Sequence, residues 1–478
     1  MNIQSIGEEW FSNLRGDLLA GLTVSLALIP EAIAFSIIAG VDPMVGLYAS
    51  FCIAVVIAVT GGRPGMISAA TGSMALIMIV LVRDFGLEYL LAATLLTGVL
   101  QFVLGYMNVG RFITFIPYSV VIGFVNSLAI LIFLAQVPFV IGQSGLTYMM
   151  VAATLAIIYL LPRFTRVVPA PLVAIVLMTG IVLLTTPDLL TVGDIGEISR
   201  QLPVFHIPTV PLSLETLLII LPYSVTLVIV GLLESLLTAT IVDEMTDTRS
   251  DKNREVRGQG CANIAAGFFG GMAGCAMIGQ SVINIKSGGR GRLSSGAAGV
   301  FLMALIIVLG EYVSRIPMAV LVGVMITVAI GTFDWQSVRD LRKMPGSDAA
   351  VMLITVAIVV ATHDLAKGVI TGVVLSALIF GWKISTLRST SLIREDGVKV
   401  YTISGQLFFG TMQSFIDLFD YAGDPGRIEI DLRNSHVWDH SAVTGIVKAI
   451  TRYRQNGKRV YITGLDEDSQ RLVDQAYS

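Results

Sequence analysis

Charged residues are scarce in this chain of 478 residues. Asp, Glu, Lys and Arg make up 14% of it and hydrophobic residues 54%, and the mean hydropathy is +0.80. Soluble globular proteins contain about 25% charged residues, so the composition excludes an ordinary cytosolic protein and a disordered chain. The net charge of −3 lacks the basic excess of nucleic-acid binders, and no nucleic-acid partner is expected. The composition predicts a polytopic protein in a lipid bilayer.

Cysteine is also rare. The three cysteines, Cys52, Cys261 and Cys275, lie in apolar runs, with no CxxC pair and no histidine at metal-ligand spacing. This pattern predicts packed thiols and no metal site. The sequence shows neither a phosphate-binding glycine loop nor a nucleophile paired with a base, so we expect no enzymatic activity.

Long apolar stretches fill residues 1–390, which we assign to a transmembrane domain. A helix crosses a bilayer in about 20 residues, and twelve stretches approach or exceed this length. They are residues 16–38, 43–61, 88–108, 116–136, 147–162, 168–186, 214–241, 257–274, 294–311, 317–332, 348–362 and 367–386. Two shorter stretches, 69–82 and 278–287, follow runs of small residues, which indicates half-helices of an inverted repeat. We therefore predict 14 transmembrane elements, seven in residues 16–186 and seven in residues 214–386.

The positive charges between these elements are unevenly distributed. If the N-terminus is cytoplasmic, the loops that face the cytoplasm carry most of the Lys and Arg, as the positive-inside rule requires. The opposite loops carry only Arg83, Arg200, Arg315 and Lys367. Omitting either half-helix would reverse every later loop and remove this pattern. The distribution predicts a multi-pass protein of the cell (inner) membrane with both termini in the cytoplasm.

Two acidic residues stand out at mid-membrane places in predicted spans, where charges are costly and usually functional. Glu31 follows Pro30 in the first span, and Glu234 lies in the eighth element, the equivalent place in the second repeat. An apolar environment favours the protonated form of a carboxyl group, so Glu234, with Thr238 one turn further on, is the candidate site of a coupling ion. The alternatives are that Glu31 satisfies backbone groups freed at Pro30 and that Glu234 only hydrogen-bonds a neighbouring helix.

Each half-helix begins with small and polar residues whose backbone N–H groups have no partner in a preceding turn. Two such N-termini meeting inside the membrane would attract an anion through free amides and positive helix-dipole ends. The candidate substrate-binding residues at the two starts are Thr71, Gly72, Ser73, Ile278, Gly279, Gln280 and Ser281. The alternative is that the small residues around Gly72 and Gly279 only permit close helix packing.

Five segments of the chain match a family pattern: 30–35, 43–50, 258–271, 284–290 and 316–321. On these segments the chain resembles the sulfate permease (SulP) family of anion transporters over essentially its whole length. The resemblance implies a seven-plus-seven inverted repeat with core and gate domains, substrate between the two half-helices, elevator-like alternating access and a homodimer. It also implies that Glu31 and Phe35 face the substrate, although family members often carry Gln at the position of Glu31. Glu234 matches a position that serves a coupling proton or, where it is Asp, a sodium ion. The Glu favours a proton, sodium is the alternative, and no other cofactor is expected.

Residues 394–478 have the composition of a soluble domain. Strand patterns at 398–403, 427–432 and 459–463 alternate with helical patterns at 411–421, 441–455 and from Asp468 onward, which predicts a small α/β sheet. The segment resembles a cytoplasmic STAS domain, which implies a regulatory protein as a possible partner. Ser441 stands where that fold often carries a phosphorylatable serine, and the alternative is that Ser441 is an ordinary helix N-cap.

These observations predict a secondary active transporter of a small anion of the sulfate, bicarbonate or carboxylate class, coupled to protons. Two alternatives remain at this point. One is a nucleobase permease of the same fold, and the other is a membrane receptor that senses an anion and signals through the STAS domain. Free amides at helix ends accept many anions, so the residues do not select one substrate.

Overall fold

The computed structural model describes residues 7, 9–111, 116–165, 169–185 and 189–477. The chain forms two compact units, Met1–Gly372 and Val373–Ser478.

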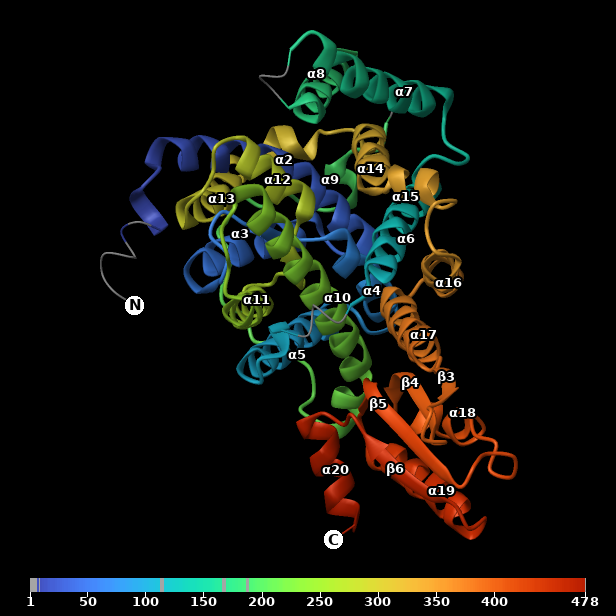
Figure 1. The fold of residues 1–478 in the computed structure, drawn as a ribbon. Coiled ribbons are helices and arrows are strands. Elements are labelled where there is room, and N and C mark those ends of the chain that lie inside the picture. Colours follow the sequence, from blue (N-terminus) through green and yellow to red (C-terminus); the bar gives the residue numbers. More distant parts are fainter. Residues whose placement is uncertain (1–6, 8, 112–115, 166–168, 186–188, 478) are drawn as a thin grey trace. The chain divides into compact units, whose positions relative to one another are not determined.

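The larger unit contains the same order of elements twice (Figure 1). The first half consists of α2 (Leu14–Ala39), α3 (Pro43–Thr60), β1 (Ser68–Ala70), α4 (Gly72–Phe85), α5 (Leu87–Tyr106), α6 (Tyr118–Gln136), α7 (Gly145–Leu160) and α8 (Ala170–Thr185). The second consists of α10 (Leu214–Thr246), α11 (Lys252–Phe268), β2 (Gly274–Ala276), α12 (Ile278–Lys286), α13 (Arg292–Ser314), α14 (Met318–Thr332), α16 (Gly346–Thr362) and α17 (Leu365–Ile384), and the boundary between the two units falls within α17. Two short helices, α9 (Val192–Ile195) and α15 (Trp335–Asp340), lie in connections.

Each apolar stretch predicted from the sequence contains one of these helices, although some bounds differ. Helix α11 ends at Phe268, before the predicted end at 274, because Gly270 adopts a positive φ of 73° and the chain then enters β2. The end residues of the stretch 168–186 lie outside the described residues. Eight of the described helices are long and apolar enough to cross a membrane, and α8, α14 and α16 are shorter apolar helices. The count of 14 transmembrane elements stays a prediction.

The two halves meet at a pair of very short strands. β1 and β2 are antiparallel, with Ser68 opposite Ala276 and Ala69 opposite Cys275, and both strands are fully buried. Side-chain oxygens take part in holding them, since Ser50 Oγ accepts from the Ala70 amide and Ser235 Oγ from the Ala276 amide. Because α4 begins directly after β1 and α12 directly after β2, this pairing brings the starts of the two half-helices together.

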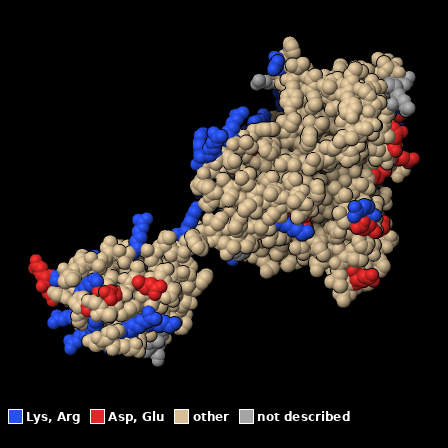
Figure 2. Space-filling model, turned by 90° about the vertical axis from the view of Figure 1, so that its right-hand side faces the viewer, with Lys and Arg blue, Asp and Glu red and all other residues tan. Residues whose placement is uncertain are grey.

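The helices of the larger unit pack as two groups. Helices α2–α5 and α10–α13 contact one another and form what we call the core group; α6, α7, α8, α14 and α16 form the gate group. Contacts between the groups involve α2 with α14 and α8, and α4 with α6. The face shown in Figure 2 is largely uncharged over this unit, while the Val373–Ser478 unit displays both basic and acidic residues. This difference fits a bilayer around the first unit and water around the second.

Two arginines of the larger unit are buried rather than solvent-exposed. Arg292 is 2% exposed, donates to the carbonyls of Ala58 and Gly61, and forms an ion pair with Glu9. Arg63 is 8% exposed and pairs with Asp243. These bonds tie the loop before β1 to elements of the second half, so the basic residues that mark loops in the sequence also hold the half-helices in place.

The smaller unit is an α/β sheet with strand order β3-β4-β5-β6. The strands are β3 (Arg388–Ile393), β4 (Lys399–Leu407), β5 (Arg427–Val437) and β6 (Arg459–Thr463), and the helices are α18 (Met412–Ile416), α19 (His440–Gln455) and α20 (Glu467–Tyr477). β3 pairs antiparallel with β4, and the other pairs are parallel. The sequence did not predict β3, which lies before residue 394, because this edge strand is largely exposed and has no apolar alternation.

The proposed N-cap role of Ser441 is wrong. The N-cap of α19 is Asp439, whose carboxylate accepts from the Ala442 amide at 2.9 Å. Ser441 lies in the first turn of the helix and is exposed. Its regulatory role stays a prediction.

A buried carboxylate organises the core of the smaller unit. Asp424 accepts hydrogen bonds from Lys399 Nζ at 2.6 Å and from the hydroxyls of Tyr401 at 2.9 Å and Tyr453 at 2.5 Å. Burial by itself would raise the pKa of Asp424, but the hydrogen bonds from Lys399, Tyr453 and Tyr401 outweigh it and hold the pKa below its ordinary value. A depressed pKa means that the ionised form stabilises the fold above the unfolded-state pKa, and this stability is lost as the pH falls through the folded-state pKa.

We expect Asp424→Asn to destabilise the smaller unit by about 2–3 kcal/mol at neutral pH, because it removes the charge that three buried donors share. Hydrogen–deuterium exchange of the full chain, followed in β4 and α19, measures this loss. The parent unit should lose protection below about pH 4, whereas the variant should show a flatter acid dependence. Equal protection of the parent and the variant at neutral pH would contradict the assigned role.

Candidate functional site

A cavity of about 110 Å³ lies between the core group and the gate group. Its lining comes from both half-helices, from the middle of α2 and α10, and from side chains of α6 and α14 that are apolar except for Thr332. The lining residues are Glu31, Phe35, Thr71, Gly72, Phe124, Val125, Leu128, Ile132, Glu234, Leu237, Met277, Ile278, Gly279, Gln280, Val328 and Thr332. Polar groups therefore come from the core side of this cavity, and the gate side is largely apolar.

The N-termini of α4 and α12 both reach this cavity. First-turn N–H groups have no partner within their own helix. In α4 the Thr71 side chain accepts from the Met74 amide, whereas no side chain caps α12. The two helix starts thus present free amides and positive dipole ends to one small space, which is the arrangement that binds an anion.

Glycine is required at one helix start and leaves space at the other. A Cβ atom on Gly72 would lie 2.9 Å from Phe35 Cε1 and 3.1 Å from Ile132 Cδ1, so a side chain there would clash. A Cβ atom on Gly279 would meet nothing within 4 Å. Gly72 therefore permits the close approach of α2 and α6 to α4, and Gly279 keeps the start of α12 open to the cavity.

The carboxylate of Glu234 is held by donors from the opposite half of the chain and from β2. Ser73 Oγ donates to Glu234 Oε2 at 2.5 Å, and Cys275 Sγ donates to the same oxygen at 3.1 Å. Thr71 Oγ1 lies 3.0 Å from Ser73 Oγ and 3.3 Å from Cys275 Sγ. The Glu234 side chain is 8% exposed and faces the cavity, so it combines burial, hydrogen-bond donors and access to the candidate anion site.

Glu31, which belongs to the first repeat, also lines the cavity. Gln280 Nε2 donates to Glu31 Oε1 at 2.8 Å, so the two residues link the middle of α2 to the start of α12. This partner is neutral, and the negative charge of an ionised Glu31 is therefore not compensated by a cation. Pro30 lies within α2, and one alternative was that Glu31 satisfies the backbone groups freed at this proline. The hydrogen-bond partner of the Glu31 side chain is Gln280.

The structure brings most of the predicted site residues together around the cavity, and three of them lie just outside its lining. Ser73 bonds Glu234 as described. Thr238 Oγ1 donates to the backbone carbonyl of Glu234 at 2.7 Å. Ser281 Oγ accepts from the Ile67 amide at 3.0 Å, so this hydroxyl helps to fix the approach to β1.

The sequence analysis missed several residues of this site. Cys275 was assigned only to packing, because an isolated cysteine in an apolar run has no pattern that indicates a polar partner. Its contact with Glu234 follows from the packing of β2 against α10, which the sequence does not show. The cavity-lining residues of α6 and α14 were also missed, because most of them are apolar residues within apolar spans. Apolar residues that line a cavity cannot be distinguished in the sequence from apolar residues that face lipid.

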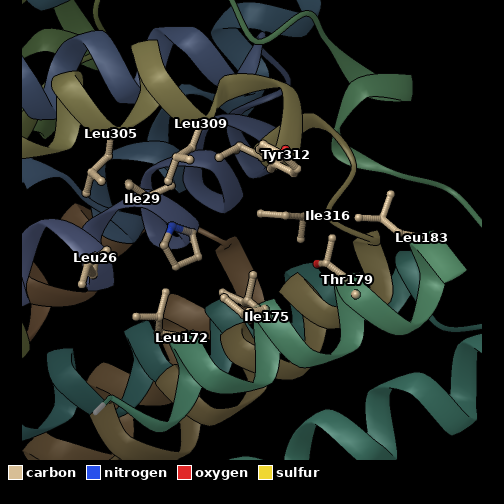
Figure 3. A pocket seen from close by; sticks show the side chains of 14 residues that line it. Leu26, Ile29, Leu172, Ile175, Thr179, Leu183, Leu305, Leu309, Tyr312 and Ile316 are labelled. Carbon is tan, nitrogen blue, oxygen red and sulfur yellow. The ribbon is translucent and has the colours of Figure 1, made fainter. Parts of the chain in front are cut away.

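A second, larger cavity of about 480 Å³ lies between α2, α8 and α13 (Figure 3). Figure 3 shows Leu172, Ile175 and Leu183 on one side and Leu305 and Leu309 on the other. Its lining is almost wholly apolar, with Thr179 and Tyr312 as the side chains that carry hydroxyls. It lacks the charged and amide donors that an anion requires, so the smaller cavity is the candidate site.

Comparison with known proteins identifies the family. The sequence pattern described as the sulfate permease family matches residues 14–152 and 144–355, which is more than half of the chain. The chain belongs to the sulfate permease family. The STAS domain pattern matches residues 390–477, in agreement with the fold of the smaller unit. Proteins of this family are membrane transporters of anions and not enzymes, as the sequence analysis expected.

Individual relatives cover nearly the whole chain. It is 57% identical to the putative sulfate transporter YbaR of Bacillus subtilis, over 99% of both chains. Among solved structures, the transmembrane domain of a cyanobacterial bicarbonate transporter BicA has a TM-score of 0.68 and 27% identity, covering 77% of this chain and 98% of that one. Murine Slc26a9 in the inward-facing state has a TM-score of 0.85 and 17% identity, covering 98% and 88%, which shows a shared fold. These matches confirm the expected class, a polytopic helical transporter with a STAS domain.

Proposed function

We propose that this protein is a secondary active transporter of a small inorganic anion, sulfate or bicarbonate, and that transport is coupled to protons through Glu234. The observation that carries the proposal is the cavity in which two helix N-termini and a buried carboxylate face one another. The free amides of α4 and α12 suit an anion of either kind. The names of the relatives, a putative sulfate transporter and a bicarbonate transporter, support this choice over a nucleobase.

Proton coupling is supported by the surroundings of Glu234. The carboxyl group lies in a membrane-embedded, mostly apolar cavity, and among the described residues its side-chain donors are the neutral Ser73 hydroxyl and Cys275 thiol. Such a setting makes protonation accessible, and a proton on Glu234 lowers the repulsion between this group and an anion in the same cavity. Thr238 Oγ1 donates its proton to the backbone carbonyl of Glu234, so this hydroxyl helps to fix the helix backbone at Glu234.

Alternating access is supported by the position of the cavity. The helix N-termini and the two carboxyl groups all belong to the core group, whereas the gate group contributes a wall that is apolar except for Thr332. A movement of the core group past the gate group would therefore carry the complete anion site to the other side of the membrane. We propose this elevator-like movement in a homodimer of the cell membrane, with both termini in the cytoplasm and the STAS domain available to a regulatory protein.

Uptake into liposomes tests the proposed function. The purified full chain is reconstituted without any partner protein, and uptake of radiolabelled sulfate and bicarbonate is followed with and without an imposed proton gradient. Accumulation above equilibrium that requires the gradient supports proton-coupled transport and excludes a receptor without flux. Equal uptake with and without the gradient contradicts the coupling, and no uptake of either anion contradicts the proposed substrates.

Glu31→Gln is expected to tighten anion binding. The substitution removes a negative charge that lines the cavity but keeps an oxygen that can accept from Gln280, so affinity for sulfate should rise by about fivefold or more at neutral pH. Equilibrium binding of labelled sulfate to the purified protein measures the change. Glu311→Gln is the matched control, because Glu311 is an exposed carboxylate that pairs with Arg200 away from the cavity. Weaker binding in Glu31→Gln than in the parent would show that the carboxylate contributes to anion binding.

A further inference from the structure

Three side chains form a continuous series of hydrogen bonds from Glu234 to the cavity wall. Ser73 Oγ is 2.5 Å from Glu234 Oε2, and Thr71 Oγ1 is 3.0 Å from Ser73 Oγ. Thr71 and Ser73 are 2% and 0% exposed, and Thr71 lines the cavity. The series therefore joins the buried carboxyl group to the place where an anion would contact the start of α4.

The ionisation of Glu234 determines the direction of this series, because each hydroxyl has one proton to donate. An ionised carboxylate only accepts, so Ser73 donates to Glu234 and Thr71 donates to Ser73. In this state the Thr71 hydroxyl has no proton left to donate into the cavity. Only the lone pairs of Thr71 Oγ1 are available to a ligand, and the same oxygen accepts from the Met74 amide at 3.5 Å. An anion at the start of α4 would then meet an acceptor.

Protonation of Glu234 reverses every bond of the series. The carboxylic acid donates to Ser73 Oγ, and Ser73 donates to Thr71 Oγ1. The Thr71 O–H group is then free to rotate and donate into the cavity. We propose that this reversal converts Thr71 from an acceptor into a donor for the bound anion, and that it is the link between the proton and the anion. The inference rests on the proposed function, since it takes Glu234 as the coupling acid. Each hydroxyl keeps its own proton and rotates, so the one proton gained or lost is that of Glu234.

Cys275 provides a second hydrogen-bond connection from Glu234 to Thr71, and its direction also depends on the ionisation of Glu234. Its thiol donates to Glu234 Oε2 at 3.1 Å and lies 3.3 Å from Thr71 Oγ1. When Glu234 is ionised the thiol proton is held by the carboxylate. When Glu234 is protonated the thiol is free to donate to Thr71. Both routes end at the Thr71 hydroxyl.

The other titratable groups around this series are few in the described part of the chain. Glu31 lines the same cavity as Glu234, and Cys275 contacts Glu234 directly. The helices packed against α10 carry further charges that do not line the cavity, namely Arg83 and Asp84 of α4, Glu88 of α5, Lys252, Arg254, Glu255 and Arg257 of α11, and Lys286 of α12. A test of Glu234 therefore has to remove the contribution of Glu31.

Equilibrium binding of labelled sulfate to the purified full chain, at about pH 6 and about pH 8, tests the reversal. Sulfate keeps its double charge across this range, so a change in affinity reflects a change in the protonation of the protein. Binding is measured in the parent and in Glu31→Gln, which leaves Glu234 as the carboxyl group lining the cavity. We expect affinity at the lower pH to be about fivefold to tenfold higher in both. Glu234→Gln should bind at the higher pH as tightly as the parent does at the lower one, because its amide donates to Ser73 at every pH.

Substitutions within the series separate the reversal from a structural role. Thr71→Val should lose the rise in affinity at the lower pH, and Thr71→Ser, which keeps the hydroxyl and the N-cap, should retain it. Ser73→Ala should reduce the rise to about twofold, through the remaining thiol route. Ser25→Ala, which removes a buried hydroxyl bonded within α2 at Leu22, is the matched control and should behave as the parent.

Two results would overturn the inference in distinguishable ways. If Thr71→Val and Ser73→Ala keep the full rise in affinity while Glu234→Gln has lost it, the hydrogen-bond reversal is wrong and coupling through Glu234 stands. If the parent binds sulfate equally at both pH values, or binds no sulfate at all, the proposed function fails and the inference fails with it.

Discussion

Glu234→Gln is expected to abolish proton-driven accumulation of the anion. Glutamine keeps the size of the side chain and can still bond Ser73 and Cys275, but it cannot take up or release a proton. Uptake into liposomes under a proton gradient should therefore fall by at least about tenfold, to the level reached without the gradient. Because the anion-binding amides of α4 and α12 are unchanged, the variant should still bind sulfate and exchange it across the membrane at equilibrium.

The comparison with Glu31→Gln and Glu311→Gln makes this result specific. All three substitutions exchange a carboxylate for an amide, but Glu234 alone is bonded to both Ser73 and Cys275. Accumulation should persist in Glu31→Gln and Glu311→Gln. A Glu234→Gln protein that accumulates anion as the parent does, with the same pH dependence, would remove Glu234 from the coupling mechanism.

The parts of the site that could be predicted from the sequence are those that break the rule of an apolar membrane interior. Glu31 and Glu234 stand out because charges are rare in spans, and the half-helices stand out because glycines and other small residues interrupt the apolar pattern before Gly72 and Gly279. The repeat then places the two acids and the two helix starts in equivalent positions. These features are local in the sequence, so no knowledge of helix packing was needed.

The partners of these residues could not be predicted, because they depend on contacts between the two halves. Ser73 and Glu234 are far apart in the chain, and their bond follows from the packing of α4 against α10. Cys275 and Glu234 both belong to the second half, and they meet through the packing of β2 against α10. Arg292 illustrates the same point for charge: in the sequence it is one of several basic loop residues, whereas in the structure it is fully buried against Ala58 and Gly61.

In the smaller unit, strands with apolar alternation were found and the exposed strand β3 was not. The alternation in β4, β5 and β6 comes from one buried face, while β3 pairs along the edge of the sheet with little side-chain burial.

The N-cap of α19 lies two residues before Ser441, the N-cap candidate in the sequence. Both Asp439 and Ser441 are good N-caps, and the choice between them depends on where β5 ends at Val437.

Gly279→Val is expected to abolish anion binding without destabilising the protein. The space at the Gly279 Cβ position is empty within 4 Å, so valine fits, but its methyl groups would cover the first-turn amides of α12 and occupy the cavity. Hydrogen bonds to a charged ligand contribute about 1.5–3 kcal/mol each, so the loss of two of them predicts a decrease in sulfate affinity of about hundredfold or more. Thermal stability should be unchanged or slightly higher, because glycine within a helix costs about 0.5–1 kcal/mol relative to alanine.

Gly180→Val is the matched control, because Gly180 lies in α8 at the apolar cavity and its Cβ position is also empty within 4 Å. Sulfate binding and thermal unfolding are measured on the same preparations, so that a loss of ligand is separated from a loss of fold. A stable Gly279→Val protein that binds sulfate as the parent does would place the anion away from the start of α12. Gly72→Val is the opposite case: its clash with Phe35 and Ile132 predicts loss of stability together with loss of binding. The pair of glycines therefore distinguishes a residue that keeps the site open from one that allows the surrounding helices to approach.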